Sequence, residues 1–313
     1  MRLIRHLEDL PYDALQRGSV MTVGAYDGLH LGHQQLLGRV VSEARATGLP
    51  SVVMSFEPTP KEFFSVERPP ARLMRFREKF EALASSGIDY FYCPRFAPWM
   101  RAISADAFIR RILVHGLNVR HLVVGDDFRF ARKREGSVEH LLRAGQALQY
   151  RVDQVSSVIV DGTRVSSTAI RDALRDGDVR RATALLGRPY RMSGKVIEGR
   201  RVGRSLGYAT ANVDLRRRRS AVTGIYAVRV QGLRGSPLDG VASVGTRPTF
   251  DLEKPLLEVH LFDFDADIYG KYIHIDFIAH LRDVEKFASV DELVAQMDVD
   301  AENARAVLAA DKA

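Results

Sequence analysis

The sequence predicts an α/β domain built on a parallel sheet, followed by an antiparallel β domain and a terminal α-helix. In the first half, short apolar runs alternate with segments of helical periodicity, as in parallel strands joined by crossover helices. In the second half, β-type runs follow one another with only glycine-rich or polar turns between them, which indicates a barrel or a sandwich. The change of pattern near Gly187 predicts two domains, 1–186 and 187–313.

The elements follow from these periodicities. In the first half we expect strands at 19–26, 51–56, 89–93, 121–125 and 150–155, and helices at 31–47, 76–86, 104–115, 137–148, 168–175 and 178–186. In the second half we expect strands at 191–197, 224–232, 238–244, 256–264 and 272–281, and an amphipathic helix at about 289–310.

Composition and charge narrow the function classes. The chain of 313 residues is 46% hydrophobic and 27% charged, and no apolar run reaches the roughly 18 residues of a membrane helix. The N-terminus shows no secretory signal, and the single cysteine, Cys93, ends an apolar run, so we expect a cytoplasmic protein without a membrane partner, in which Cys93 is buried. The net charge is +7, but basic residues are scattered and only Arg216–Arg219 form a dense run. We therefore expect no nucleic-acid partner, although charge alone does not separate this class from enzymes of anionic nucleotides.

Residues 24–33, GAYDGLHLGH, join a predicted strand to the next predicted helix. Glycines at 24, 28 and 32 let the backbone approach a ligand closely, and a helix N-terminus points free N–H groups at an anion. His30 and His33, one turn apart, can donate hydrogen bonds to phosphate oxygens. A zinc site is the alternative, but HExxH is absent and no third ligand lies nearby; a purely structural histidine pair is another.

The HLGH motif resembles the HxGH signature of the nucleotidylyltransferases, which transfer a nucleotidyl group and release pyrophosphate. The whole segment is similar to GxFDGxHxGH of bacterial bifunctional riboflavin kinase/FAD synthetases, with Ala25 at the position where asparagine is frequent and Tyr26 at that of the usual phenylalanine. The resemblance implies that His30 and His33 are catalytic, and that the nucleotide is bound by Gly24, Asp27, Gly28 and Gly32.

Three more segments of the first half resemble this family. FEPTP (56–60) is similar to its FxPxP loop, GDDFRFA (125–131) to GxDFxFG with Ala131 replacing the usual glycine, and RVSSTAIR (164–171) to its SSTxIR element. The resemblance implies flavin contacts by Phe56, Pro58, Asp127 and Phe128, and nucleotide contacts by Arg164, Ser167, Thr168 and Arg171. For the serine and threonine run, plain helix capping is the alternative.

The second half begins with GKVIEGRRVGRSLGYATAN (194–212), which is not a Walker A loop. It resembles the flavokinase motif G-x-x-x-G-R-x-x-G-[FY]-P-T-A-N, with Ala209 replacing proline, so the turn before Thr210 loses a backbone restraint. The resemblance implies nucleotide contacts by Gly194, Gly203 and Arg204, and a Mg²⁺ site at Thr210 and Asn212. Tight turns of a β domain are the alternative explanation of these glycines.

LEVHLFDFDADIYG (257–270) and HLRDVEKF (280–287) also resemble the kinase module. Glu258 alternates with Leu256, His260 and Phe262 on one face of a predicted strand. The resemblance makes Glu258 the general base for the 5′-hydroxyl of riboflavin and places Arg282 at the flavin. A solvent-facing strand glutamate is the alternative for Glu258.

Together the motifs imply a bifunctional enzyme. The N-terminal domain is expected to be a Rossmann-like nucleotidylyltransferase that converts ATP and FMN into FAD and pyrophosphate. The C-terminal domain is expected to be a flavokinase β-barrel that converts ATP and riboflavin into FMN and ADP with Mg²⁺. Two alternatives stay open: another HxGH nucleotidylyltransferase with an accessory β domain, and a basic nucleic-acid-binding protein, although RNP-type aromatic patterns are missing.

Overall fold

The computed structural model describes residues 1–199, 208–247 and 254–312. Its contacts divide the chain into two compact units, of which the first comprises Met1–Pro70 and Phe76–Val165, and the second Ala71–Arg75 and Ser166–Ala313. The pentapeptide 71–75 therefore packs with the second unit, although the residues on either side of it belong to the first. The two helices between Ser166 and residue 187 also pack in the second unit. The domain boundary between 186 and 187 stays a prediction.

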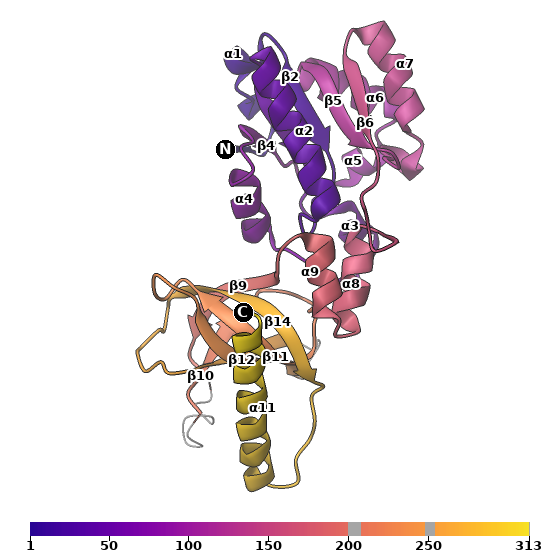
Figure 1. The fold of residues 1–313 in the computed structure, drawn as a ribbon. Coiled ribbons are helices and arrows are strands. Elements are labelled where there is room, and N and C mark those ends of the chain that lie inside the picture. Colours follow the sequence, from indigo (N-terminus) through magenta and orange to yellow (C-terminus); the bar gives the residue numbers. More distant parts are fainter. Residues whose placement is uncertain (200–207, 248–253, 313) are drawn as a thin grey trace. The chain divides into compact units, whose positions relative to one another are not determined.

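A six-stranded sheet forms the centre of the first unit (Figure 1). Its strands are β1 (Arg2–Ile4), β2 (Ser19–Val23), β3 (Ser51–Met54), β4 (Tyr90–Tyr92), β5 (Val119–Gly125) and β6 (Arg151–Val155). They are ordered β1-β4-β3-β2-β5-β6 and every neighbouring pair is parallel, which confirms the predicted parallel sheet. β1 was not predicted, because three residues are too few to show a periodicity.

Helices connect these strands. They are α1 (Tyr12–Leu15), α2 (Leu31–Thr47), α3 (Pro60–Phe64), α4 (Phe76–Ala84), α5 (Pro98–Ala102), α6 (Ala105–Phe108) and α7 (Val138–Leu148), with 3₁₀ turns η1 (Leu7–Asp9) and η3 (Arg132–Arg134). The helix expected at 104–115 is divided into α6 and a π-helical segment, η2 (Ile109–Gly116), and beyond it the Leu117 N–H still bonds the Ile112 carbonyl five residues back. A small hairpin, β7 (Ile159–Val160) and β8 (Thr163–Arg164), ends the unit.

Both faces of the sheet are covered. Met21 and Val23 of β2 belong to a large core with Phe108, Ile112 and Leu113 of α6 and η2. The alternate residues of β2 point to the opposite face, where α2 packs on β2, β3 and β5. Of the apolar positions that we expect on one face of this helix, Leu37, Val40, Val41 and Ala44 are buried, and Leu36 is only partly buried. Cys93 is buried in this unit, as predicted.

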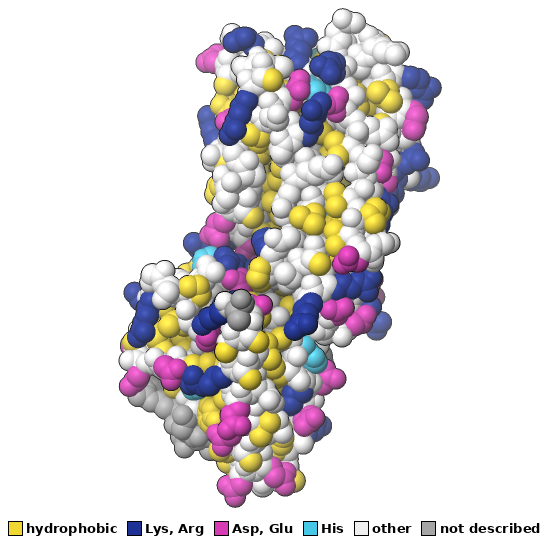
Figure 2. All heavy atoms as spheres, viewed as in Figure 1, with side chains coloured by type: hydrophobic (Ala, Val, Ile, Leu, Met, Phe, Trp, Pro, Cys, Tyr) yellow, Lys and Arg dark blue, Asp and Glu magenta, His cyan; other side chains and the backbone are white. Residues whose placement is uncertain are grey.

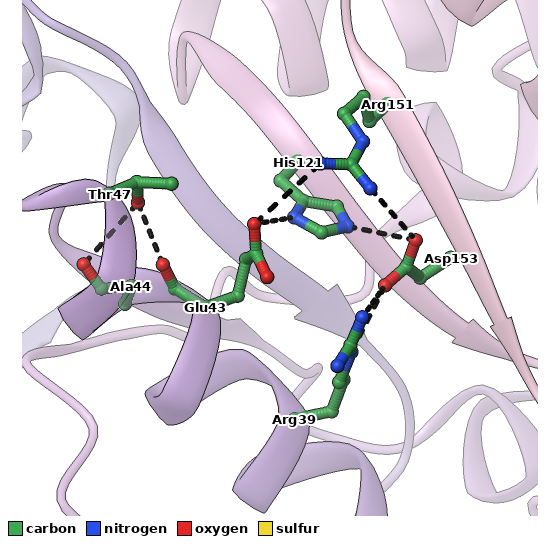
Figure 3. A network of polar contacts seen from close by, with 7 residues as sticks. All are labelled: Arg39, Glu43, Ala44, Thr47, His121, Arg151 and Asp153. Carbon is green, nitrogen blue, oxygen red and sulfur yellow. Dashed lines mark hydrogen bonds and ion pairs between the residues drawn. The ribbon is translucent and has the colours of Figure 1, made fainter.

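A polar network ties α2 to β5 and β6 (Figure 3). The buried ring of His121 lies between two carboxylates, with Nδ1 3.2 Å from Glu43 and Nε2 3.1 Å from Asp153. Arg39 donates to Asp153 from Nε at 3.1 Å and from Nη2 at 2.9 Å. Burial raises the pKa of Asp153, but the hydrogen bonds from Arg39 and His121 outweigh it, so the pKa is lowered overall. The network therefore holds the helix that begins at the HxGH segment.

The second unit is a closed antiparallel barrel, which decides between the two predicted architectures. Its strands are β9 (Tyr190–Ile197), β10 (Thr210–Asp214), β11 (Gly224–Gln231), β12 (Leu238–Arg247), β13 (Lys254–Leu261) and β14 (Tyr272–Arg282), in the closed order β10-β13-β12-β11-β14-β9. The helices α8 (Ser167–Arg175) and α9 (Val179–Leu186) precede it.

The terminal helix α11 (Val290–Ala310) lies along the barrel, as Figure 1 shows. Its buried Ala304 and Leu308 pack with Ala227 and Phe262. Asp300 of the same helix, also buried, binds Arg282 of β14 through two bonds of 2.8 and 2.7 Å. Apolar packing and paired charges together fix the helix on the barrel wall.

The surface of the described residues carries charges of both signs. On the face that Figure 2 shows, basic side chains are interspersed with acidic and apolar ones over the described residues. None of the helices in the described part of the chain is long and apolar enough to cross a membrane.

Candidate active sites

In the first unit, the sheet topology brings three motifs to one edge. β2 is flanked by β3 and β5, with Val23 paired to Met54 and Thr22 paired to Val123. Because parallel strands end at the same edge, the GAYDGLHLGH segment after β2, the FEPTP segment near the end of β3 and the GDDFRFA segment at the end of β5 are neighbours there. The strand order reverses at β2 and β5, which is where ligands bind in open α/β sheets.

The turn after β2 has the tight backbone that its glycines predicted. Gly24 donates its N–H to the Met54 carbonyl at 3.0 Å, Gly28 has a φ of +90°, and even Tyr26 and Leu29 have positive φ values of 50° and 43°. The ring of Tyr26 is fully buried, and its hydroxyl is 2.7 Å from that of Thr22. Burial raises the pKa of Tyr26, with the Thr22 contact acting against it. Tyrosine fits where phenylalanine is usual because its hydroxyl has this partner.

His30 and His33 form a stacked pair at the start of α2. His30 is the N-cap residue and its Nδ1 accepts the His33 N–H at 3.3 Å. The two ring centroids are 3.6 Å apart at an interplanar angle of 17°. Burial, then the nearby charges of His30 and Lys79, lower the pKa of His33 well below 6.5, so the ring is neutral at pH 7. Among the described residues its Nδ1 has no hydrogen-bond partner, so this nitrogen is available to a ligand.

Lys79 of α4 is a site residue that the sequence did not reveal. Its side chain is only 2% exposed, and Nζ donates to the Ala25 carbonyl at 2.7 Å. The Ser55 hydroxyl donates to the same carbonyl at 3.1 Å. Burying a cation costs free energy unless the charge is hydrogen-bonded or paired. The ammonium group of Lys79 lies at the turn that precedes the HxGH motif. The sequence did not indicate a role for Lys79, because a lysine in an amphipathic helix usually faces solvent.

Aromatic rings surround the FEPTP segment. Phe56 packs edge-on against Phe96 at 5.5 Å between centroids, and Phe63 and Phe64 of α3 extend this cluster. Pro58 follows a cis peptide bond, and Thr59 caps α3 in a reciprocal pair with Glu62. The predicted flavin contacts Phe56 and Pro58 thus lie in an apolar, well-capped loop.

The segment after β5 lines a pocket of about 290 Å³ formed by Asp126, Asp127, Phe128, Arg129, Arg134, Val138 and Glu139. Asp127 is paired with Arg164 at 2.7 Å, which joins a predicted flavin contact to a predicted nucleotide contact. Phe128 stacks on Phe130 at 5.6 Å. Ala131 has φ 64° and ψ −173°, a conformation that favours glycine, so the alanine found here is strained.

The SSTAIR run lies in the second unit. Ser166 caps α8 by accepting the Ala169 N–H at 3.1 Å, and Ser167 and Thr168 occupy the first turn. Arg171 donates from Nε to the Ala71 carbonyl at 2.7 Å and from Nη1 to the Ser167 carbonyl at 3.1 Å. Capping is therefore real, and the nucleotide contacts of Ser167, Thr168 and Arg171 stay predictions.

The predicted kinase residues share the outer face of the barrel wall. Glu258 on β13 lies directly opposite Asn212 on β10, and Thr210 lies opposite His260. The intervening residues Leu257 and Val259 are fully buried, so their neighbours on the strand point outwards. A hydroxyl, an amide and a carboxylate thus meet on one patch.

Two glycines explain how the strands approach. A Cβ on Gly194 would lie 2.7 Å from the Asp214 carbonyl oxygen, and one on Gly199 would lie 2.1 Å from the Asn212 amide nitrogen. Gly194 therefore serves close strand packing, and its predicted nucleotide contact is untested. Gly199, another glycine of the 194–212 segment, leaves room for the Asn212 side chain. Gly203 and Arg204 lie outside the described residues.

Arg282, the predicted flavin contact, is bonded to Asp300 of α11 and also donates to the Asp283 carbonyl at 2.9 Å. The hydrogen bonds to Asp300 raise its pKa, against burial. The guanidinium faces the ring of Phe287 at 5.7 Å. Its role toward flavin stays a prediction.

Comparisons with known proteins cover both units. Residues 13–169 match the FAD synthetase family model, and residues 186–308 match the riboflavin kinase model. The chain is 45% identical over 305 residues to the bifunctional riboflavin kinase/FMN adenylyltransferase of Escherichia coli K12, covering 97% of each chain. It is 43% identical to that of Pseudomonas fluorescens over 310 residues, covering 99% of this chain and 98% of that protein.

Among solved structures, a crystal structure described as a macrolide-efflux protein from Streptococcus pneumoniae matches with a TM-score of 0.82 and 32% identity, covering 97% of this chain and 98% of that one. The complete two-part fold is thus shared with an experimental structure. With family models on both parts and relatives matched over nearly their whole length, the chain belongs to the bifunctional riboflavin kinase/FMN adenylyltransferases, which use ATP to make FMN from riboflavin and FAD from FMN.

Proposed function

We propose that Glu258 is the general base of the riboflavin kinase reaction. Its carboxylate accepts the proton of the riboflavin 5′-hydroxyl while that oxygen attacks the γ-phosphorus of ATP, and ADP leaves. The observation that supports this role is the pairing of Glu258 with Asn212, next to Thr210, on the outer face of the barrel. A carboxylate beside neutral oxygen donors suits a base that works near a bound metal–nucleotide.

Mg²⁺ would be held by the Thr210 hydroxyl and the Asn212 amide oxygen. These are hard oxygen donors, and Mg²⁺ bound with ATP usually takes one or two protein ligands plus phosphates and waters. When bound, the ion offsets the charge of the phosphates.

For FAD formation, we propose that His30 and His33 stabilise the charge that develops on the α-phosphate and the leaving pyrophosphate. The FMN phosphate is already anionic and attacks the α-phosphorus directly, so no strong base is required. His33 is neutral before binding, and triphosphate charge nearby would raise its pKa, so the ring would gain positive charge as the nucleotide arrives. The backbone of Gly24, Gly28 and Gly32, with Asp27, would hold the nucleotide.

The remaining roles follow from position in the first unit. Phe56 and Pro58 follow β3, and Asp127 and Phe128 follow β5, the two strands that flank β2; these four residues would contact the flavin. Arg164, paired with Asp127, would contact phosphate when that pair opens. A single buried cysteine fits a reducing environment, and we propose a cytoplasmic location.

The test is one incubation with riboflavin, ATP and Mg²⁺, followed by separation of the flavins. Glu258→Gln is expected to stop FMN formation while FMN supplied directly is still converted to FAD. The retained second step shows that the loss is confined to the kinase reaction. A Glu258→Gln enzyme that phosphorylates riboflavin at the wild-type rate would refute the assignment of the base.

A further inference from the structure

His260 lies beside the kinase site, yet none of the roles above uses it. It is two residues from Glu258 on β13, on the same outer face, and directly opposite Thr210 of β10. Its Nδ1 lies 3.0 Å from the carbonyl oxygen of Ala209, the residue immediately before Thr210. A carbonyl oxygen can only accept, so Nδ1 must carry the proton in this contact.

The imidazole is itself held in place. The ring of Tyr208 meets it edge-on at 4.9 Å between centroids, and the ring of Phe262, which directly follows β13, lies 5.8 Å away between centroids. Phe262 is buried, so this side of the ring rests on a fixed surface. Tyr208 is fixed in turn, because its hydroxyl donates to Asp298 of α11.

The bonded carbonyl lies where the chain enters β10. Ala209 is exposed and precedes the first residue of β10. Alanine allows this turn more backbone conformations than a proline would. A hydrogen bond to the peptide that joins Ala209 to Thr210 limits those conformations directly.

We propose that His260 is a positioning residue of the kinase site, which fixes the Ala209–Thr210 peptide through its Nδ1–H and so presents the Thr210 hydroxyl to Mg·ATP. The inference rests on the proposed role of Thr210. In this role His260 touches neither flavin nor phosphate. Because it holds the Ala209–Thr210 peptide in one conformation before Mg·ATP binds, less conformational entropy is lost on binding.

Two substitutions of similar size separate the hydrogen bond from mere bulk. The amide nitrogen of asparagine occupies nearly the place of Nδ1, whereas that of glutamine reaches toward the place of Nε2. His260→Asn is expected to keep the KM for Mg·ATP near that of the wild type, and His260→Gln and His260→Ala to raise it about fivefold to tenfold. The KM for riboflavin and the conversion of FMN to FAD are expected to stay unchanged, which also reports correct folding.

Rescue gives the decisive test. Proline at 209 fixes φ without any hydrogen bond, so His260→Ala combined with Ala209→Pro is expected to recover most of the lost Mg·ATP affinity. Failure of Ala209→Pro to rescue, in an enzyme that still makes FAD from FMN, would overturn the proposal. Equal KM values for the asparagine and glutamine variants would overturn it as well.

A separate variant tests the proposed role of Thr210, on which this inference rests. If Thr210→Val leaves the KM for Mg·ATP unchanged, the role of Thr210 is wrong. The contact itself is then read from the ¹⁵N chemical shifts of the His260 ring. A proton on Nδ1 supports the hydrogen bond from His260 to the Ala209 carbonyl. A proton confined to Nε2 overturns the proposal, even if the Thr210 variant confirms the role of Thr210.

Discussion

The rings of His30 and His33 stack 3.6 Å apart, and the backbone N–H of His33 donates to Nδ1 of His30. The first ring therefore caps the helix that carries the second. Burial, then the nearby charges of His30 and Lys79, lower the pKa of His33 in this arrangement. Four predictions follow from the charges and contacts of the first unit.

The first concerns the pH dependence of His33. Because its pKa is lowered in the folded state, the unfolded chain takes up a proton below about pH 6.5 that the folded chain does not. The stability contributed by the neutral ring is present above that pH and is lost as pH falls, by at most about 1.4 kcal/mol per pH unit. Trp99, the one tryptophan of the sequence, lies in this unit and reports its unfolding in urea. His33→Gln should lose less stability than the wild type between pH 7 and pH 5; equal losses would contradict the shift.

The second concerns Lys79. Lys79→Met removes the donor to the Ala25 carbonyl and a positive charge near His33, so the pKa of His33 should rise and FMN adenylylation should slow by about tenfold or more. An NMR titration of His33 and the rate of FAD formation measure the two effects. Arg17→Met removes an exposed cation of the same unit and should change neither. A slower rate without any pKa change would show that Lys79 does not act through His33.

The third concerns the strained loop. Ala131 has φ 64° and ψ −173°, so Ala131→Gly should stabilise the first unit by about 1 kcal/mol, once the added freedom of glycine in the unfolded chain is subtracted. Ala144→Gly, within α7, should destabilise it by about 1 kcal/mol. Urea unfolding followed at Trp99 compares the two. Destabilisation by both substitutions would show that Ala131 is not strained.

The fourth concerns the network in Figure 3. Asp153→Asn removes a charged acceptor from Arg39 and from His121, and should cost about 2 kcal/mol of unfolding free energy in the first unit. The matched control is Glu81→Gln, which breaks an exposed pair with Arg77 and should cost less than about 0.5 kcal/mol. Similar costs for both would mean that the network adds nothing to an ordinary surface pair.

Local patterns in the sequence predicted much of the fold. The apolar spacing of α2 gave both of its ends, and the runs at β2, β3 and β5 showed the strands that carry the motifs. Short elements such as β1 and α5 were missed, because they are fixed by contacts with distant strands rather than by their own periodicity. The predicted helix at 104–115 proved to be two segments for the same reason: the apolar pattern does not distinguish four-residue from five-residue bonding.

The sequence by itself indicated the reaction types, through its resemblance to the HxGH and flavokinase motifs, which are short, contiguous and recognisable without the fold. Tertiary structure alone decided which groups share a surface. Parallel pairing gathered the loops after β2, β3 and β5, burial made Lys79 part of the HxGH turn, and the β10–β13 register set Glu258 against Asn212 and His260 against Thr210. These relations join residues that are 31 positions apart, as for Val23 and Met54, to 101 positions apart, as for Thr22 and Val123. No local period exists over such separations. The relations depend on which strands pair and on which side chains are buried when they do.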